Sequence, residues 1–472
     1  MDESIREFDY DVAIIGGGSA GYAAARTTAA AGLKTAVVEG GAKVGGLCIL
    51  RGCMPTKALL WASEVLHLSQ RASIWGVLPR DVGFDFEKVM ARKDAMVEEF
   101  ASYRRQQLND GRFVLVRANA VFTDPHTLQL DNGSSLTARH FIIATGSKVA
   151  PVPLPGLNTI GYMTSDIALQ RRALPKSLLV LGGGAVAVEF AQFFARLGVQ
   201  VVLIQRSHHI LRDFDTDAAS VLEGVFQREG ICLATDTRLL DCRIEGGLKV
   251  IGFERQSKRV ECAAEEILFA LGRIPAIESL GLESAGVRVE SGRVWTNDGM
   301  QTSASHIWAA GDCTGRHEIV HIAIQQAEIA AHNILHPNKP RTIDDRLLVS
   351  VVFTEPQVAT VGLTEKAALA GGISFLTASY PFNDHGKSLI MEARDGFVKL
   401  LACPATGEIL GGCCVGPLGG ELIHEIVVAM HQRLTVHTLA SIPHYHPTLA
   451  EIWTYPAEEL ASAIPLKSRG NE

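Results

Sequence analysis

The stretch that decides the fold is YDVAIIGGGSAGYAAARTTAAAGLKTAVVEG, residues 10–40. An apolar run leads into a glycine cluster, an alanine-rich segment follows, and a second apolar run begins after another glycine. This order predicts a strand, a tight turn, a helix and a second strand. Gly16, Gly18 and Gly21 form the pattern G-x-G-x-x-G, which lets the backbone approach a pyrophosphate at the N-terminus of the helix. Glu39 ends the second apolar run, where a carboxylate can bind a ribose hydroxyl.

The same unit occurs again in SLLVLGGGAVAVEFAQFFARLGVQVVLIQRS, residues 177–207. Gly182 and Gly184 occupy the first two glycine positions, and Ala187 occupies the third. Two such units in one chain predict two dinucleotide sites, which suggests that electrons pass between two cofactors.

The two units differ at the residue that would meet the ribose. The second unit has Gln205 where the first has Glu39, with Arg206 next to it and Arg212 shortly beyond. A carboxylate repels a 2′-phosphate, whereas a neutral residue beside arginines accommodates one. We therefore expect FAD or NAD in the first unit and NADP in the second, unless Arg206 and Arg212 are ordinary solvated surface charges.

Two further predicted strands end in glycine turns. FIIATGS, residues 141–147, contains Thr145 and Gly146, and IWAAGDCTG, residues 307–315, contains Asp312. A carboxylate in such a turn can reach the ribityl or phosphate part of a flavin nucleotide, or it can simply cap the next helix.

Length and composition limit the class of protein. The 472 residues suggest about two to four domains. The chain is 47% hydrophobic with 45 glycines and 6% aromatic residues, which is typical of an α/β protein with parallel strands. A net charge of −7 argues against a nucleic-acid or anionic-membrane surface. The N-terminal MDESIREFDYD lacks the basic-then-apolar order of a signal peptide, and polar residues interrupt the most apolar stretch, residues 178–199. We expect a cytoplasmic protein.

A pair of cysteines, Cys48 and Cys53, lies in GGLCILRGCMPTK, residues 45–57. Their C-x₄-C spacing is not the usual spacing of a zinc site, and no second Cys/His cluster is close in sequence. In a regular helix the two Cα atoms would be about 8–9 Å apart, beyond the roughly 7 Å limit for a disulfide, so a bridge needs a distorted turn. A helix N-terminus would also stabilise a reactive thiolate.

In combination, these motifs give the chain its resemblance to a known family. The chain resembles the flavin-dependent pyridine nucleotide–disulfide oxidoreductases, the family of dihydrolipoamide dehydrogenase, glutathione reductase and mercuric reductase. The resemblance covers essentially the whole length, and its further motifs are LGRIPAIESLGL, residues 271–282, with Gly272 and Arg273, and HYHPTLAEIW, residues 444–453.

The resemblance implies the fold and its divisions. It implies an α/β protein with two Rossmann-like dinucleotide-binding domains, for FAD and NAD(P), and a C-terminal α+β interface or dimerisation domain. The FAD domain would take residues 1–150 and 276–343, the NAD(P) domain residues 151–275, and the interface domain residues 344–472. The cofactor-binding residues would be Gly16, Gly18, Gly21, Glu39, Thr145, Gly146 and Asp312 for FAD, and Gly182, Gly184, Ala187, Gln205, Arg206, Arg212, Gly272 and Arg273 for NADP.

The resemblance also implies the reacting groups. Cys53 would lie against the flavin and form a charge-transfer complex, and Cys48 would exchange with the substrate disulfide. Lys57 would pair with a glutamate, Glu189, on the nicotinamide side of the flavin. The acid/base would be a histidine oriented by a carboxylate, which the motif assigns to His446 and Glu451. That pair comes from the other subunit in the family, so the active site would need a homodimer.

The chain departs from the family at three places. Leu47, Leu50 and Arg51 replace the residues of the usual GGTCxNxGC motif. Arg51 could lower a thiol pKa, meet an anionic acceptor or simply pair with a surface acid. The second nucleotide unit is more similar to NADPH-using glutathione reductases than to dihydrolipoamide dehydrogenases. The C-terminal PLKSRGNE has no cysteine pair of the kind that mercuric reductases use to transfer metal.

These observations predict a cytosolic, homodimeric disulfide oxidoreductase that passes electrons from NADPH through FAD to Cys48–Cys53 and on to a small disulfide, or in reverse, as in dihydrolipoamide dehydrogenase. No metal site, nucleic acid or membrane is expected. The alternatives are a metal-ion or quinone reductase on the same scaffold, and a non-catalytic flavoprotein subunit of a larger complex.

Overall fold

A computed structural model describes residues 7–465 of the chain. Residues 1–6 and 466–472 lie outside that range, so the structure does not test the expectations about an export signal and about the cysteine-free C-terminus. Among residues 7–465, no helix combines the length and the apolar character needed to cross a bilayer.

The elements have the following bounds. The strands are β1 (Tyr10–Ile15), β2 (Thr35–Val38), β3 (Val114–Val116), β4 (Ala120–Asp124), β5 (Thr127–Leu130), β6 (Ser135–Ile143), β7 (Ser147–Val149), β8 (Ser177–Leu181), β9 (Gln200–Ile204), β10 (Cys232–Ala234), β11 (Thr237–Glu245), β12 (Leu248–Arg255), β13 (Lys258–Ala264), β14 (Glu266–Phe269), β15 (Arg273–Pro275), β16 (Val289–Glu290), β17 (Arg293–Val294), β18 (Ile307–Ala309), β19 (Val349–Val352), β20 (Gln357–Gly362), β21 (Leu376–Pro381), β22 (Phe397–Ala402) and β23 (Ile409–Gly416). The α-helices are α1 (Ser19–Ala30), α2 (Gly46–Arg51), α3 (Cys53–Arg71), α4 (Phe86–Leu108), α5 (Leu157–Ile160), α6 (Ser165–Ala168), α7 (Ala185–Arg196), α8 (Thr216–Arg228), α9 (Val320–Leu335), α10 (Glu365–Ala370), α11 (Gly386–Ile390), α12 (Gly419–His431), α13 (Val436–Ser441) and α14 (Thr454–Ala463). Short 3₁₀ helices lie at η1 (Ala72–Trp75), η2 (Asp312–Thr314), η3 (Asp345–Leu347), η4 (Phe382–Asp384) and η5 (Ala450–Trp453).

The first predicted unit forms β1, α1 and β2, and its sheet has the strand order β3-β2-β1-β6-β5-β4. β1 pairs in parallel with β2 and β6, and β18 joins from far along the chain in parallel with β6. In this register Ile15 lies beside Ile143, and Ile143 lies beside Ala309. Because parallel strands end at the same edge of a sheet, the turns after β1, β6 and β18 meet at one edge.

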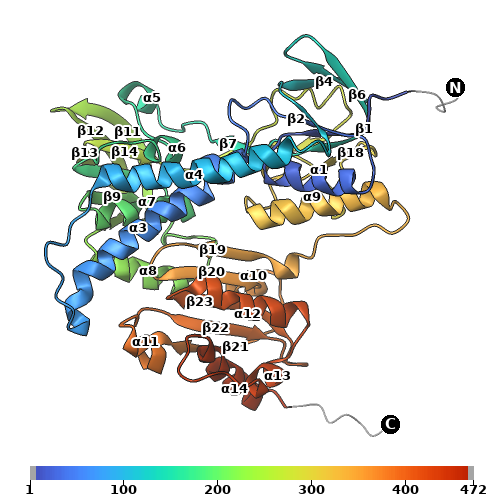
Figure 1. Cartoon of the computed structure of the whole chain (residues 1–472). Helices are drawn as coiled ribbons and strands as arrows, with labels where there is room; N and C mark the ends of the chain where they lie inside the picture. The colour runs from blue at the N-terminus through green and yellow to red at the C-terminus, as the bar shows by residue number, and fades with distance from the viewer. Residues whose placement is uncertain (1–6, 466–472) are drawn as a thin grey trace, which may run out of the picture.

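The second predicted unit forms β8, α7 and β9, in a parallel sheet of order β10-β9-β8-β14. An antiparallel sheet of β11, β12 and β13 accompanies it. The C-terminal part is an antiparallel sheet of order β19-β20-β23-β22-β21, with α12, α13 and α14 packed around it (Figure 1). Its core contains the fully buried Trp453 and Phe382.

The first glycine of each dinucleotide motif has the same structural requirement. Gly16 and Gly182 have φ values of +108° and +117°. A Cβ at Gly16 would lie 2.3 Å from the carbonyl oxygen of Ala144, and one at Gly182 would lie 2.3 Å from that of Ala270. Both glycines therefore press against the end of the neighbouring parallel strand, where a side chain has no room and the backbone conformation favours glycine.

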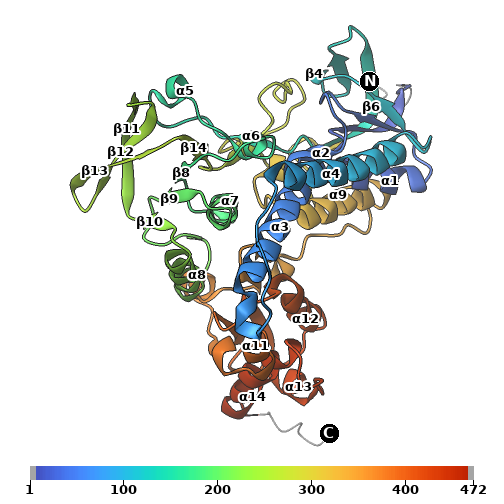
Figure 2. The ribbon, with the colours of Figure 1, turned by 60° about the vertical axis from the view of Figure 1, so that its left-hand side comes forward.

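A long helix connects the three parts. α3 begins beside the first unit and runs toward the C-terminal sheet, as both views show (Figures 1 and 2). It packs against α4 and against α7 of the second unit. Cys53 begins this helix and Cys48 lies in the short helix just before it, so the packing of α3 sets their position relative to the second unit.

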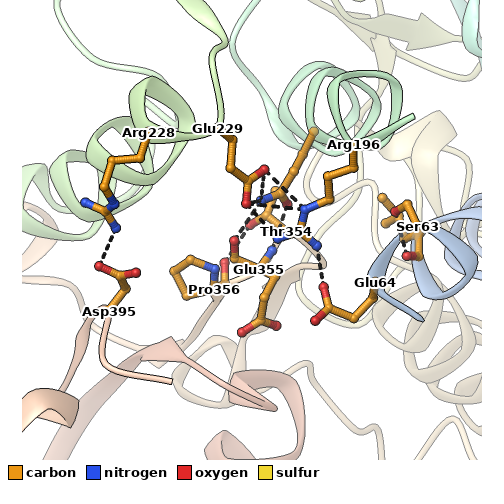
Figure 3. Close-up of polar contacts among 11 residues, drawn as sticks. Ser63, Glu64, Arg196, Arg228, Glu229, Thr354, Glu355, Pro356 and Asp395 are labelled. Carbon is orange, nitrogen blue, oxygen red and sulfur yellow. Dashed lines mark hydrogen bonds and ion pairs between the residues drawn. The ribbon is translucent and has the colours of Figure 1, made fainter. Parts of the chain in front are cut away.

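A buried arginine ties α7 to α3 and α8. Arg196 is 5% exposed and donates to Glu64 of α3 and, at 2.8 Å, to Glu229 directly after α8 (Figure 3). The two carboxylates are 17% and 13% exposed, so they are held largely away from water. Buried charges are tolerated when they are paired, so this contact fixes the relative position of the three helices.

A glutamine one turn earlier on α7 reaches the C-terminal part. Gln192 is 2% exposed. Its amide donates to the backbone oxygen of Glu355 at 2.7 Å and accepts from the Glu355 N–H at 2.8 Å. The loop between β19 and β20 is therefore hydrogen-bonded to the same helix face that contacts α3.

We expect Arg196→Met to lower the free energy of unfolding by roughly 3 kcal/mol, because the substitution leaves two buried carboxylates without their partner. The matched control is Arg228→Met, which breaks the nearby pair of Arg228 with Asp395, whose side chains are 59% and 51% exposed (Figure 3). The control should change stability by less than about 1 kcal/mol. Urea unfolding of the two holoenzymes measures the difference, and equal losses would contradict the assignment.

Candidate active site

The two redox cysteines lie on either side of a break between two helices. Cys48 belongs to α2, and Cys53 is the first residue of α3. Gly52 separates them with φ −129° and ψ −114°, values far from the helical region. The distortion that the C-x₄-C spacing requires is therefore located at Gly52.

The approach of this segment to the first unit also depends on a glycine. Gly46 has φ +75°, and a Cβ on it would lie 2.6 Å from the Cα of Gly18. The redox segment therefore rests directly on the glycine turn at the start of α1. This contact places the cysteines beside the predicted dinucleotide site.

The two thiols share one hydrogen bond, and it differentiates them. The hydrogen bond from Cys48 lowers the pKa of the Cys53 thiol to about 7, and the positive charge of Lys57 lowers it further against the opposing effect of burial. The same hydrogen bond, together with burial, raises the pKa of Cys48 well above the ordinary thiol value. Near neutral pH, Cys53 is thus the thiolate of the pair and Cys48 carries the proton.

The predicted pair of Lys57 and Glu189 is formed. Lys57 follows Cys53 by one turn of α3, and its ammonium lies 3.0 and 2.8 Å from the two carboxylate oxygens of Glu189 on α7. Glu189 is 3% exposed and also accepts the backbone N–H of Phe353 at 2.9 Å. The Lys57 ammonium lies 4.6 Å from the centre of the Phe353 ring. Phe353 was not predicted as a site residue. Its polar contact is made by the backbone N–H, and the fold of the C-terminal part brings it to the site.

The edge of the first sheet offers groups that fit a dinucleotide. Glu39 accepts the backbone N–H of Gly17 at 2.7 Å, so its carboxylate is anchored at the glycine turn. The N-terminus of α1 has no side-chain cap, which leaves its first amides available to an anion. The hydroxyl of Thr145 is buried without a hydrogen-bond partner among residues 7–465. Asp312 accepts the hydroxyl of Ser147 at 2.6 Å.

The second unit places Gln205 and Arg206 at the end of β9. Gln205 is buried next to Gly183, and its side-chain oxygen accepts the Arg206 N–H at 3.1 Å. The Arg206 side chain is exposed, and no contact to another described residue involves its guanidinium. Arg212 is 54% exposed and lies 3.5 Å from Asp213. The N-terminus of α7, at Gly184, again has no side-chain cap.

The third motif position explains why the two units differ in sequence. A Cβ at Gly21 would lie 1.8 Å from the backbone oxygen of Gly16, so the first turn requires glycine there. Ala187 fills the same position in the second unit and is fully buried. The second turn is therefore wide enough for a methyl group.

Gly272 and Arg273 differ in their surroundings: Gly272 comes two residues after Ala270, whose backbone oxygen lies against Gly182 of the second unit, whereas Arg273 contacts the first sheet. Arg273 donates to the hydroxyl and the backbone oxygen of Ser147, both at 2.8 Å. Because Ser147 also donates to Asp312, Arg273 lies next to the edge of the first sheet. No contact within the described part of the chain joins it to Gln205 or Arg206.

The predicted dyad is formed in the C-terminal part. The Nδ1 atom of His446 lies 3.0 Å from Glu451, whose carboxylate is 11% exposed, whereas the His446 side chain is 77% exposed. Glu451 also lies 3.4 Å from Nε2 of His385, a fully buried histidine that sequence reasoning missed. Burial lowers the pKa of His385, against the opposing effect of the Glu451 carboxylate.

Within one chain the dyad does not meet the cysteines. It lies between α13 and α14, at the opposite end of the molecule from α1 and α4 (Figure 1). No contact between residues 7–465 joins His446 or Glu451 to Cys48 or Cys53.

Arg51 and His444 each pair with an acidic side chain. Arg51 pairs with Asp166 of α6 at 3.2 Å, and it is not among the largest influences on either thiol pKa. Of its three predicted roles, the structure thus supports pairing with an acid. His444 lies 2.6 Å from Glu425. The cysteines of β23, Cys413 and Cys414, are both buried.

Comparisons with known proteins agree with this geometry. The family model for pyridine nucleotide-disulphide oxidoreductases matches residues 10–327, and the model for the dimerisation domain of the same family matches residues 348–457. The chain is 35% identical to a dihydrolipoyl dehydrogenase of Bacillus subtilis, over 94% of this chain and 96% of the relative. It is 34% identical to a mercuric reductase of Staphylococcus aureus, over 94% and 81% of the two chains.

Solved structures extend the likeness. The HOCl-induced flavoprotein disulfide reductase RclA of Escherichia coli, solved as a Cu(II) complex, aligns with a TM-score of 0.85 at 27% identity, over 95% of this chain and 99% of that chain. LpdA of Mycobacterium tuberculosis aligns with a TM-score of 0.86 at 28% identity over the same shares. These findings support an α/β flavoprotein that uses FAD and a pyridine nucleotide. The chain belongs to the pyridine nucleotide-disulphide oxidoreductase family.

Proposed function

We propose that the protein is a homodimeric, NADPH-dependent reductase of small disulfides, similar in its reacting groups to dihydrolipoamide dehydrogenase. The observation that carries this proposal is the placement of Cys48 and Cys53 on either side of the break at Gly52, one helical turn before the Lys57–Glu189 ion pair. The same groups would also serve the reverse reaction, the oxidation of a dithiol.

The residues that would hold FAD lie at one edge of the first sheet. The amides at the start of α1 would bind the pyrophosphate, Glu39 would bind a ribose, and Thr145 and Asp312 would bind the remaining polar groups. Bound FAD supplies a two-electron carrier between a nicotinamide hydride and a disulfide. We assign residues 1–150 and 276–343 to the FAD domain, 151–275 to the NADP domain and 344–472 to the interface domain.

The protonated state of Cys48 determines what the exchange step needs. The Cys48 thiol gives its proton to an imidazole as its sulfur attacks the substrate, forming a bond to one half of the disulfide. The other half leaves as a thiolate and takes that proton. The Cys53 thiolate then attacks the Cys48 sulfur, which restores the Cys48–Cys53 disulfide and releases the second half as a thiol after protonation. In sum, NADPH, a proton and one disulfide give NADP⁺ and two thiols.

The imidazole in this scheme is His446 of the second subunit. The exposed His446 ring has a ring nitrogen directed away from Glu451, and that carboxylate fixes the tautomer. The dyad lies in the segment matched by the dimerisation-domain model, which supports its delivery across a dimer interface.

NADPH is proposed over NADH because of the residues at the end of β9. Gln205 brings no negative charge, and the exposed guanidinium of Arg206 is available for a 2′-phosphate. The exposed Arg212 lies shortly beyond.

Metal-ion reduction is the second candidate, since the relatives include mercuric reductases and the RclA structure contains Cu(II). The His446–Glu451 dyad favours a disulfide, because a thiol leaving group needs a proton and a metal ion does not. A variant of His446 that still reduces a metal ion at the wild-type rate, but no disulfide, would separate the two activities.

We expect the thiolate of the reduced holoenzyme to appear with a pH midpoint near 7 and to disappear below it. Lys57→Met should move this midpoint upward, because it removes a positive charge that favours the thiolate. The control is Lys88→Met, which changes a lysine that is 86% exposed and pairs with Asp85. Thiolate absorbance in the ultraviolet measures both, and a wild-type midpoint at the ordinary thiol value would contradict the assignment.

We expect anaerobic NADPH oxidation with lipoamide or bis(2-hydroxyethyl) disulfide as acceptor. His446→Gln should lower kcat by roughly 100-fold or more, because the proton transfer loses its catalyst. The matched control is His444→Gln, two residues away, which should keep activity close to the wild type. Equal activities of the two variants would rule out the dyad, and the absence of any disulfide turnover by the wild type would overturn the proposed function.

We expect Arg206→Glu to lower kcat/KM for NADPH by about 10-fold to 100-fold, the range of a lost hydrogen bond to a charged group. The KM for NADH should change little. Arg238→Glu, on β11 of the antiparallel sheet that accompanies this unit, controls for the change in net charge, and the Arg238 side chain is 70% exposed. A coenzyme preference that is unaltered in Arg206→Glu would show that the 2′-phosphate site is elsewhere.

A further inference from the structure

A guanidinium without a partner lies close to the redox pair. Arg104 belongs to α4, and its guanidinium lies 4.1 Å from the centre of the Tyr22 ring on α1. Its Nε and Nη1 atoms are buried and have no hydrogen-bond partner within residues 7–465. Burial lowers the pKa of Arg104, but an arginine remains charged in a protein. A charged donor in this position favours an anion that the chain itself does not supply.

The neighbouring arginines are neutralised, which distinguishes Arg104 from them. Arg112 donates to the Tyr22 hydroxyl at 3.3 Å and pairs with Asp110 at 2.6 Å. Arg26, also on α1, pairs with Glu328 of α9. Arg26, Arg104 and Arg112 thus all lie near Tyr22. Of these three, only Arg104 has no carboxylate partner in the described part of the chain.

This charge lies on the Cys48 side of the redox pair. α4 packs against α2, the helix that carries Cys48, and α1, α2 and α4 lie together in Figure 2. Arg104 and Cys48 are close enough to interact electrostatically. Lys57 and Glu189 act on Cys53, from the side of α7. The thiol that would attack the substrate is therefore within electrostatic reach of a positive charge that has no carboxylate partner among the described residues.

We propose that Arg104 binds a carboxylate of the disulfide substrate beside Cys48, and that the preferred substrates are small disulfides with a carboxylate on the thiol half. This inference rests on the proposed function and narrows its substrate class. A planar guanidinium can hold a carboxylate through two parallel hydrogen bonds, which orients the substrate as well as attracting it. The ring of Tyr22 supports the guanidinium from its face and restricts its rotation.

Disulfides that differ in charge but little in size test the proposal directly. The probes are 2,2′-dithiodiacetate, bis(2-hydroxyethyl) disulfide and cystamine, which are anionic, neutral and cationic. The wild type should show the highest kcat/KM for the anion and the lowest for the cation. Arg104→Met should lower the anion-to-neutral ratio of kcat/KM by about 10-fold to 100-fold, the range expected for hydrogen bonds to a charged group.

A matched control excludes a general effect of charge. Arg105→Met removes the same charge from the adjacent residue of α4, which pairs with Glu98 and is 39% exposed. It should keep the wild-type ratio. If Arg104→Met does not fold, Arg104→Lys provides the same measurement, because a lysine keeps the charge but cannot form the two parallel hydrogen bonds. An unchanged ratio in the Arg104 variant, or a wild type that does not prefer the anion, would overturn the proposal.

A second measurement does not depend on turnover. The holoenzyme, reduced with dithiothreitol, is alkylated with iodoacetate, an anion, or with neutral iodoacetamide, and labelling of Cys48 is followed by peptide mass spectrometry. Arg104→Met should lower the iodoacetate-to-iodoacetamide rate ratio at Cys48, and Arg105→Met should not. If Arg104→Met lowers this rate ratio but the wild type reduces no disulfide, the proposed function is refuted and the anion site at Arg104 is supported. If the enzyme reduces disulfides but Arg104→Met leaves the rate ratio at Cys48 unchanged, the proposed role of Arg104 is refuted.

Discussion

The ion pair of Lys57 and Glu189 is the contact on which the rest of the site depends. It joins the helix that begins with Cys53 to the first helix of the second nucleotide unit, and Glu189 also holds the backbone of Phe353 from the C-terminal part. A carboxylate that is 3% exposed is tolerated in the interior when it is paired, so the three parts of the chain are bound to one another at a single charged point. Gln192 and Arg196 continue the same face of α7 and strengthen that junction with further contacts to the same three parts.

The asymmetry of the two thiols follows from their surroundings. Cys53 is stabilised as a thiolate by its neighbour and by Lys57, whereas Cys48 keeps its proton and needs an external base. In the proposed function, the exposed His446 of a second subunit is this base. Within its own chain, no contact between residues 7–465 joins His446 to either cysteine. In the proposed function, a site divided between two subunits supplies both halves of the chemistry.

Much of this arrangement can be predicted from the sequence, because the elements concerned are local. The glycine turns, the helices after them and the cysteine segment are encoded within short stretches, and Gly16 and Gly182 have the backbone conformation that the motif requires. The contacts that complete the site are not local. Phe353 contributes a backbone N–H, His385 contacts Glu451 from 66 residues away, and Arg104 is notable for having no partner. No pattern at short spacing encodes such contacts. Arg51 illustrates the same limit, since its neighbours in sequence left three roles open and its contact with Asp166, 115 residues away, supports one of them.

The proposed function requires that electrons from NADPH reach Cys48 and Cys53, and one measurement tests this step directly. The oxidised holoenzyme is treated with NADPH under anaerobic conditions and no disulfide substrate, quenched with acid, and its new thiols are alkylated and mapped by mass spectrometry. The account predicts new thiols at Cys48 and Cys53 and at no other cysteine. Reduction of the flavin without the appearance of these thiols would contradict it.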